Sequence, residues 1–317
     1  MRKVIGIGET VFDIIFHDDQ PVNATPGGST YNSMISLGRA GIPAEFISET
    51  GDDRVGRRIM AFLEENGVSS QSVCIHSGQK SALSLAFLNA QKDAEYVFYK
   101  DHARDRLEFR YPQIEPDDVV LYGSFYAINP VVRDQVKSFL KYASDGGAIL
   151  YYDVNFRSSH KDDALKLLPN IRENFELADV VRGSNEDFEI LFDMKNADDV
   201  YEQRIAPFCR NFIYTRGADP AELRGAGEVR RQYAAKPVNA VSTIGAGDNF
   251  NAGFVFGLIR YEITRQQLRS GLSTDLWDGL FECAQAFSGN VCQSMYNYID
   301  VEFGIGMKEK MNIIKCK

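Results

Sequence analysis

Short apolar runs rich in β-branched and aromatic residues alternate with amphipathic stretches along most of the chain. The runs predict strands at residues 3–8, 44–48, 119–123, 148–153, 180–181 and 212–215. Between them, helical patterns cover residues 54–66, 131–143 and 162–174. Strands joined by helices of this length imply βαβ units, a mostly parallel sheet and helices on both faces. Because no linker or repeat interrupts the alternation, we expect one α/β domain over residues 1–317.

One segment breaks this alternation. Residues 81–100 read SALSLAFLNAQKDAEYVFYK, in which Leu83, Leu85 and Phe87 alternate before a polar QKD turn and a second strand. This pattern predicts a β-hairpin. The hairpin forms either a small accessory sheet that covers a site or an extra edge on the main sheet.

Charge and cysteine usage limit the classes of partner. The 35 basic and 44 acidic side chains give a net charge of −9, so a nucleic-acid-binding surface is not expected. No apolar run reaches the roughly 18 residues of a membrane-spanning helix. Five scattered cysteines form no CxxC pair, and Glu9 and Asp13 interrupt the N-terminus too early for a signal peptide. We therefore expect a cytoplasmic protein that binds neither nucleic acid nor membrane.

The sharpest local motif is VSTIGAGDNFNAG at residues 241–253. Gly245 and Gly247 flank Ala246, Asp248 follows, and a helical pattern begins there. Glycines allow the backbone to approach a ligand closely, and free amides at a helix start suit a phosphate or an oxyanion. A plain turn with Asp248 as a helix cap is the alternative. The motif is no Walker A loop, and GIGETV near the N-terminus lacks the third glycine of a dinucleotide-binding fingerprint.

A second polar motif lies near the N-terminus. Gly27 and Gly28 make a flexible turn that exposes backbone amides, and Asn32 follows four residues later. Asp13 comes after the first strand, where α/β sheets place ligand-binding residues. An Asp and an Asn beside exposed amides form a donor–acceptor set for vicinal hydroxyls, although each residue type is also common in turns and caps.

A third polar cluster, Asp153, Asn155 and Arg157, follows the predicted strand at residues 148–153. Alternate side chains there project to one side, into the same crevice at the strand ends.

Together these motifs resemble the PfkB, or ribokinase-like, family of carbohydrate kinases, and among them most of all the fructokinases. The similarity runs nearly end to end: GE after the first strand, the di-glycine, GDDRVG at 51–56, the hairpin ending in FYK, DxNxR and GAGD. The resemblance implies a three-layer ribokinase-like fold with a small β lid from about residues 14–30 and 81–110. It also implies phosphorylation of a sugar hydroxyl with ATP and Mg²⁺.

The resemblance further implies roles for individual residues. Asp248 matches the general base, and the amides of Gly245, Ala246 and Gly247 match the anion hole for the transferring phosphoryl group. The substrate-side matches are Asp13, Gly27, Gly28, Asn32, Tyr99 and Arg157. The nucleotide-side matches are Asn185, Thr215, Gly217 and Gln285, with Glu186 acting on Mg²⁺ through the phosphates.

Four positions depart from the family pattern. Ser242 stands where the family has Asp, which weakens the expected monovalent-cation site. Phe188 replaces a glutamate, for which either Glu186 or Asp187 could substitute, and Pro220 replaces a glycine of the nucleotide loop. Lys100 replaces the lid arginine. None of these changes removes the base or the anion hole, so we expect an active kinase.

The motifs leave the substrate open. A hexose such as fructose fits Asp13, the di-glycine and Asn32. The sugar acid 2-keto-3-deoxygluconate is the close alternative, because Arg157 could pair with its carboxylate. Nucleosides and ribose are further options. A catalytically silent sugar sensor on the same fold is the alternative of a different class. The apolar face of the hairpin is a candidate contact for a homodimer.

Overall fold

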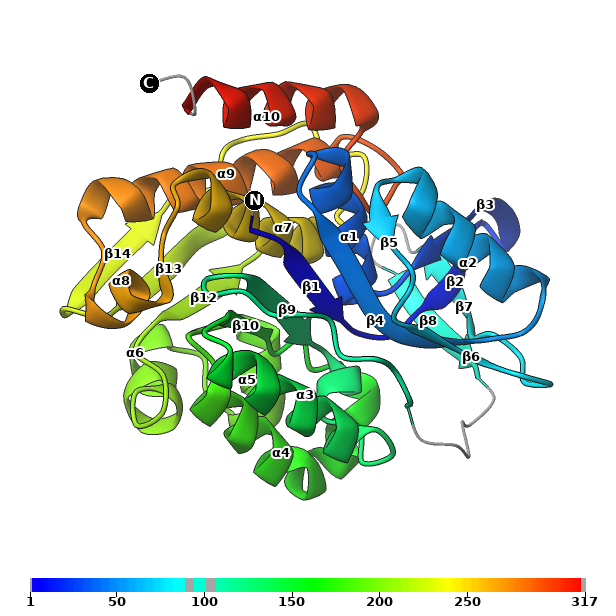
Figure 1. The fold of residues 1–317 in the computed structure, drawn as a ribbon, viewed down its shortest axis with the longest axis horizontal. Coiled ribbons are helices and arrows are strands. Elements are labelled where there is room, and N and C mark those ends of the chain that lie inside the picture. Colours follow the sequence, from blue (N-terminus) through cyan, green and yellow to red (C-terminus); the bar gives the residue numbers. More distant parts are fainter. Residues whose placement is uncertain (1, 89–93, 101–106, 315–317) are drawn as a thin grey trace.

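A ten-stranded sheet forms the centre of the fold in the computed structural model, which describes residues 2–88, 94–100 and 107–314 (Figure 1). Its strand order is β14-β13-β12-β11-β10-β9-β1-β4-β5, with β6 beside β4. The strands from β12 to β5 pair in parallel, and β13 and β14 are antiparallel. The bounds are β1 (Val4–Ile7), β4 (Ala44–Gly51), β5 (Val68–Ser69), β6 (Val73–His76), β9 (Val119–Gly123), β10 (Ile149–Asp153), β11 (Val180–Ser184), β12 (Phe212–Arg216), β13 (Asp219–Gly225) and β14 (Val229–Tyr233). The prediction of a mostly parallel sheet is confirmed.

Helices cover both faces of this sheet and give three layers (Figure 1). One face carries α1 (Ser29–Arg39), α2 (Arg54–Glu65), α7 (Ala246–Arg260), α8 (Arg265–Ser270), α9 (Thr274–Cys292) and α10 (Val301–Ile314). The other face carries α3 (Arg133–Asp145), α4 (Ala164–Leu177), α5 (Asn185–Phe192) and α6 (Ala197–Val200). Each face has its own apolar cluster, because the central strands bury side chains on both sides.

Helix α7 is buried on nearly every side. Its residues from Asp248 to Ile259 are all buried, and those from Ala252 to Ile259 are all apolar or glycine, so this part of the helix has no polar face. Gly253 lets α9 pack directly on it, because a Cβ at this position would lie 2.4 Å from the carbonyl oxygen of Cys283. This packing fixes the position of the N-terminus of α7 and of the GAGD motif there.

A second, four-stranded sheet lies beside the main one and has the order β3-β2-β7-β8 (Figure 1). Its strands are β2 (Val11–His17), β3 (Gln20–Gly27), β7 (Leu83–Leu88) and β8 (Ala94–Tyr99). Strands β7 and β8 pair antiparallel, and β7 pairs with β2 rather than with the main sheet. The hairpin therefore belongs to a small accessory sheet and is not an extra edge of the main sheet. Its QKD turn at 91–93 and residues 101–106 of the expected lid lie outside the described residues.

The structure lengthens several predicted elements by a few residues. Strand β11 continues through Arg182 to Ser184, whereas its apolar run ends at Val181. Helix α1 begins at Ser29, so Asn32 lies in its first turn. Every helix that the structure describes is too short or too polar to cross a lipid bilayer.

Candidate active site

The carboxyl ends of the central strands mark the position of the crevice expected from the sequence, at the point where the chain reverses its direction of progress through the sheet. Strand β1 lies between β4 and β9. From β1 the chain first continues outward through β4 and β5 on one side, and then returns to continue through β9 to β14 on the other side. Ligands of open α/β sheets bind at such a switch point. Ser124, just after β9, and Asn155, just after β10, have φ angles of 54° and 36°. Positive φ is uncommon for residues other than glycine, although asparagine adopts it more often than most, and such strain gathers at functional sites.

Asp248 lies in the first turn of α7 and faces this crevice. Its carboxylate accepts a hydrogen bond of 2.7 Å from the Ser29 hydroxyl and one of 2.8 Å from Asn32 Nδ2. Burial raises the pKa of Asp248, and the hydrogen bonds from Asn32 and Ser29 oppose that rise. The N-cap of α7 is Gly245, with no side-chain cap. Both hydrogen bonds of the Asp248 carboxylate come from α1, so the helix-cap alternative does not describe it. A desolvated, oriented carboxylate is suited to accept a proton.

Asp13 lies on β2 of the small sheet and is only 7% exposed. Its Oδ2 accepts a hydrogen bond of 3.3 Å from Asn297 Nδ2. Burial raises the pKa of Asp13 to about 7; the Ser84 hydroxyl opposes this rise, and the charge of Asp248 adds to it. A Cβ at Gly27 would lie 2.2 Å from Oδ2 of Asp13, so the carboxylate occupies the space that a side chain would need.

The second glycine of the pair sets the start of α1. Gly28 is the N-cap of α1 with a φ of 126°, and a Cβ there would lie 2.3 Å from the carbonyl oxygen of Glu9. Both the backbone angle and the close approach require glycine. This tight turn brings Ser29 and Asn32 against Asp248.

The glycines of GAGD fit tightly against two neighbouring segments. Gly245 has a φ of 77°, and a Cβ there would lie 2.8 Å from the carbonyl oxygen of Asn297. A Cβ at Gly247 would lie 3.1 Å from Nη2 of Arg182. The amide of Ala246 donates to the carbonyl of Thr243, whereas within the described part of the chain the amides of Gly247 and Asp248 donate to no backbone carbonyl. The first turn of α7 therefore keeps free donors for an anion.

Arg157 is exposed just after β10, and its positive charge opposes the rise that burial causes in the pKa of Asp13 and of Asp248. Its charge therefore acts on both carboxylates. On the small sheet, Tyr99 is 58% exposed at the end of β8, and the next residue, Lys100, forms an ion pair with Glu9 beside β1. Among the predicted substrate-side residues, the structure brings Asn32 against Asp248 and Gly27 against Asp13, whereas no contact of Tyr99 or Arg157 with these residues is seen in the described part of the chain.

Two of the predicted nucleotide-side residues, Thr215 and Gly217, lie at the end of the neighbouring strand β12, and Gln285 lies on helix α9. Thr215 is buried near the C-terminal end of β12, where its hydroxyl accepts a hydrogen bond of 2.8 Å from Arg182 Nη2. Gly217, with a φ of 57°, makes the tight turn into β13. Pro220 lies within β13, which begins at Asp219. At this position, where the family pattern has a loop glycine, the chain is therefore already a strand. Gln285 on α9 donates to the carbonyl of Ala234 at 2.7 Å.

The first turn of α5 holds the predicted pair Asn185 and Glu186. Glu186 is exposed, and the buried carboxylate of this turn belongs to Asp187. Asp187 accepts hydrogen bonds from the amides of Ser184 and Phe156. Burial raises the pKa of Asp187 to about 6, and the charge of Asp153 adds to the rise. The spacing of the motif does not indicate which of the two carboxylates, Glu186 or Asp187, is accessible. In the structure Glu186 is exposed and Asp187 is buried.

Two departures from the family pattern have structural explanations. Phe188 is fully buried and stacks against Phe192 and Tyr214, so this position belongs to the core below α5. Ser242 is buried, and its hydroxyl accepts a hydrogen bond of 3.2 Å from the amide of Ile244 in the turn before GAGD.

Sequence reasoning missed three residues that contact this site: Ser29, Arg182 and Asn297. Ser29 follows the di-glycine directly, which is a local feature that could have identified it. Arg182 is a charge in a strand that is otherwise apolar, and that contrast could have singled it out. Asn297 lies in the loop before α10 and reaches Asp13 only through the fold. The described residues contain no group of three or more His, Cys, Asp or Glu side chains that could hold a metal ion.

Comparison with known proteins agrees with this geometry. The model of the pfkB family of carbohydrate kinases matches residues 1–296. Fructokinase-1 of Oryza sativa subsp. japonica is 30% identical over 230 residues, which are 71% of each chain. The aminoimidazole riboside kinase of Salmonella enterica superposes with a TM-score of 0.79 at 21% identity, over 98% of this chain and 99% of that one. A fructokinase with bound ATP from Xylella fastidiosa gives 0.80 at 19% identity, over 98% and 100%. The structural likenesses show a shared fold.

Proposed function

The chain belongs to the pfkB family of carbohydrate kinases, and from this premise we propose that it transfers the γ-phosphoryl group of ATP to a hydroxyl of a hexose such as fructose. The observation that carries the proposal is the buried carboxylate of Asp248. It is oriented by Ser29 and Asn32 at the N-terminus of α7, beside free backbone amides.

In this proposal Asp248 is the general base. A sugar hydroxyl is a poor nucleophile at neutral pH, so a carboxylate that accepts its proton favours the reaction. As the proton passes to Asp248, the hydroxyl oxygen forms a bond to the γ-phosphorus. The bond from this phosphorus to the bridging oxygen breaks, and ADP leaves with the electron pair. The raised pKa of Asp248 supports this role, because it makes the carboxylate a stronger base.

The first turn of α7 forms the anion hole of the proposal. The amides of Gly245 and Gly247 are the donors we assign to the transferring phosphoryl group, and the helix dipole adds positive potential there. The amide of Ala246 contributes less, because Thr243 already accepts its hydrogen bond. Mg²⁺ bound to the nucleotide phosphates would neutralise part of their charge, and it needs few protein ligands in such sites. Exposed Glu186 fits contact with such an ion through water.

The charges around the sugar support a neutral substrate. The charges of Asp248 and Glu9 both act on the carboxylate of Asp13 and raise its pKa, so three carboxylates lie near one another. A substrate carboxylate would be repelled by these groups, whereas hydroxyls can donate hydrogen bonds to them. Arg157 is the feature that favours the second candidate, a sugar acid such as 2-keto-3-deoxygluconate.

The small sheet is the proposed lid. Asp13 belongs to β2 of this sheet and also lines the sugar site, so any movement of the sheet changes the sugar contacts. Closure over the sugar would exclude water, the competing phosphoryl acceptor.

The test is ADP release by the purified chain with ATP and Mg²⁺ against a panel of sugars. We expect fructose to be the best of fructose, glucose, ribose and 2-keto-3-deoxygluconate. Faster turnover of the sugar acid would replace the hexose assignment with the second candidate. Tight sugar binding without ADP release from any sugar would indicate the sugar sensor.

A further inference from the structure

A buried arginine interrupts the apolar pattern of β11, which reads VVRGS. Side chains two residues apart on a strand share a face. On the face that α7 covers, the apolar side chains of Tyr151, Val180 and Ile213 are each followed, two residues further along the same strand, by a polar one; these polar side chains, called the polar row, belong to Asp153, Arg182 and Thr215. Arg182 is 8% exposed. The polar row therefore lies beneath the N-terminus of α7.

Arg182 joins the ends of three strands and, through Asp153, helix α7. Its Nη1 donates to Asp153 Oδ1 at 2.9 Å, and its Nη2 donates to Thr215 Oγ1 at 2.8 Å. The other oxygen of Asp153 accepts a hydrogen bond of 2.8 Å from Asn251 on α7. The guanidinium thus has fixed partners on β10 and β12, and its position relative to α7 is set.

The guanidinium also lies directly against the anion hole. A Cβ at Gly247 would be 3.1 Å from Nη2 and 3.4 Å from Nη1 of Arg182, so only a glycine leaves both groups undisturbed. Burial lowers the pKa of Arg182, but the charges of Asp153 and Asp187 outweigh it and raise the pKa above its usual value. Arg182 is therefore a permanent cation behind the first turn of α7.

We propose that Arg182 is a positioning residue and the fixed cation of the phosphate site, which holds the turn at Gly247 in place and attracts the phosphates bound in front of it. The proposal rests on the proposed kinase function. Positive charge that is already oriented before the reaction stabilises the charge of a transferring phosphoryl group without reorganisation. Through Thr215, the same side chain couples the predicted nucleotide loop to the anion hole.

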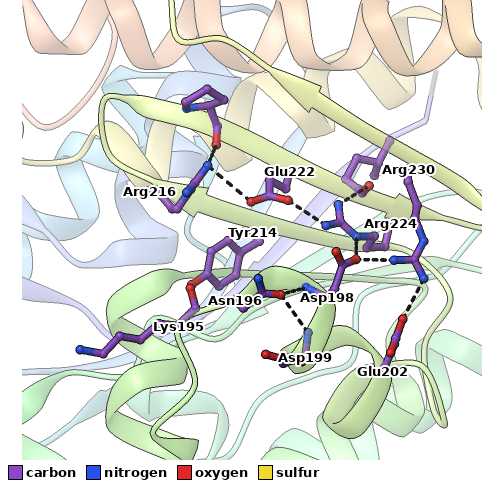
Figure 2. A network of polar contacts seen from close by, with 12 residues as sticks. Lys195, Asn196, Asp198, Asp199, Glu202, Tyr214, Arg216, Glu222, Arg224 and Arg230 are labelled. Carbon is purple, nitrogen blue, oxygen red and sulfur yellow. Dashed lines mark hydrogen bonds and ion pairs between the residues drawn. The ribbon is translucent and has the colours of Figure 1, made fainter.

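Arg224 on β13 is a matched control (Figure 2). It is 5% exposed, and it donates from Nε to Asp198, from Nη2 to Glu222 and from Nη1 to the carbonyl of Leu223. Figure 2 shows it within a network of acidic and basic side chains that reaches Asp198 of α6. Helix α6 lies on the opposite face of the sheet from α7, so Arg224 is buried and paired like Arg182 but is remote from the anion hole.

The experiment compares Arg182→Gln and Arg182→Lys with Arg224→Gln. Turnover, the dissociation constants of ATP and of fructose by calorimetry, and the unfolding temperature are measured for each. We expect Arg182→Gln to lower kcat by about 10²-fold, the scale of losing one preorganised stabilising group, and to weaken ATP binding by about tenfold. Fructose binding should stay close to wild type. Arg182→Lys keeps the charge and should recover part of both losses, whereas Arg224→Gln should lower only the unfolding temperature.

Wild-type ATP affinity and turnover in folded Arg182→Gln would overturn the proposal, as would equal losses in Arg224→Gln. Removal of one partner of a buried ion pair is strongly destabilising. If Arg182→Gln does not fold, the double variant Arg182→Gln with Asp153→Asn removes both charges and is measured in the same way. If the wild type binds ATP but phosphorylates no sugar, the proposed function fails, and ATP affinity still decides the role of Arg182.

Discussion

Asn32 donates a hydrogen bond of 2.8 Å to Asp248, although 216 residues separate the two in the chain. The first residue comes from the opening turn of α1 and the second from the opening turn of α7, and these helices lie side by side (Figure 1). Ser29 binds the other carboxylate oxygen. The two bonds fix the rotation of the Asp248 carboxyl group, so the di-glycine that starts α1 also orients the proposed base.

Asp248→Asn should reduce turnover by at least ~10²-fold, the usual scale for loss of a general base. The amide is nearly isosteric but cannot accept the hydroxyl proton. Binding of sugar and ATP should change little, which calorimetry on the variant can measure. Near-normal turnover would leave Asp248 with a structural role only.

Asp179→Asn is the matched control for that variant. Asp179 is also buried, but it precedes β11 at the opposite end of the sheet, where it pairs with Arg265 and Arg269. Its loss should lower the unfolding temperature and leave kcat unchanged in the folded protein. A comparable loss of turnover in Asp179→Asn would assign the effect of Asp248→Asn to general destabilisation.

The raised pKa of Asp13 predicts a pH-dependent sugar affinity. With a pKa of about 7, the carboxyl is mostly protonated below neutral pH and mostly ionised above it. The ionised form accepts hydrogen bonds from sugar hydroxyls, so fructose affinity should rise as pH increases through 7 and then level off. Asp13→Asn should bind fructose weakly and without this pH dependence. A wild-type affinity that is flat across this range would contradict the assignment of Asp13.

The same group predicts an opposite effect on stability. Because the pKa is higher in the folded protein than the ordinary 3.8, the protonated form stabilises the fold below about pH 4, and this stabilisation is lost as pH rises through 7. Asp13→Asn should therefore raise the unfolding temperature relative to wild type at pH 8, and much less at pH 4. Thermal unfolding at the two pH values measures the difference.

The sequence was sufficient to predict the elements whose patterns are local. Strands such as β9 and β10 are buried on both faces and read as continuous apolar runs, and the GAGD motif lies at the start of α7 as expected. Asp248 and Asn32 were likewise found from short motifs. These features depend on neighbours in the chain, which a sequence displays directly.

Contacts between segments that are distant in the chain could not be predicted from the sequence. Asn297 reaches Asp13 across 284 residues, and its position depends on how the loop before α10 packs on Gly245. The partners of Arg182 can be identified only when β10, β11 and β12 are known to lie next to each other. The choice between Glu186 and Asp187 depends on which side of α5 faces the sheet, and the motif spacing does not determine that.

The small sheet should become more protected when the sugar binds. If it closes as a lid, the backbone amides of β7 and β8 should exchange more slowly with deuterium in the presence of saturating fructose, because closure orders their hydrogen bonds. The β13–β14 hairpin at the far edge of the main sheet serves as the internal control. Unchanged exchange in β7 and β8 with a true substrate would indicate a static sheet.

Arg157 provides the test of substrate class. Its side chain is exposed just after β10, and its charge acts on Asp13 and Asp248. With a hexose, its guanidinium donates only to neutral hydroxyls or to phosphates, whereas a sugar acid would receive a bidentate, charge-assisted contact that is roughly twice as strong. Arg157→Lys keeps the charge but loses the planar fork. We expect the wild type to prefer fructose over 2-keto-3-deoxygluconate and Arg157→Lys to retain that preference.

The control for this variant is Arg172→Lys on α4, where the exposed arginine pairs with Glu176. It should leave kcat/KM for both sugars unchanged, because α4 covers the face of the sheet opposite α7. The decisive measurement is the ratio of kcat/KM for fructose to that for 2-keto-3-deoxygluconate. A wild type that prefers the sugar acid, with a preference that Arg157→Lys removes and Arg172→Lys keeps, would refute the hexose assignment. The carbohydrate kinase would then be one that recognises a carboxylate through Arg157, and the role of Asp248 would be unaffected.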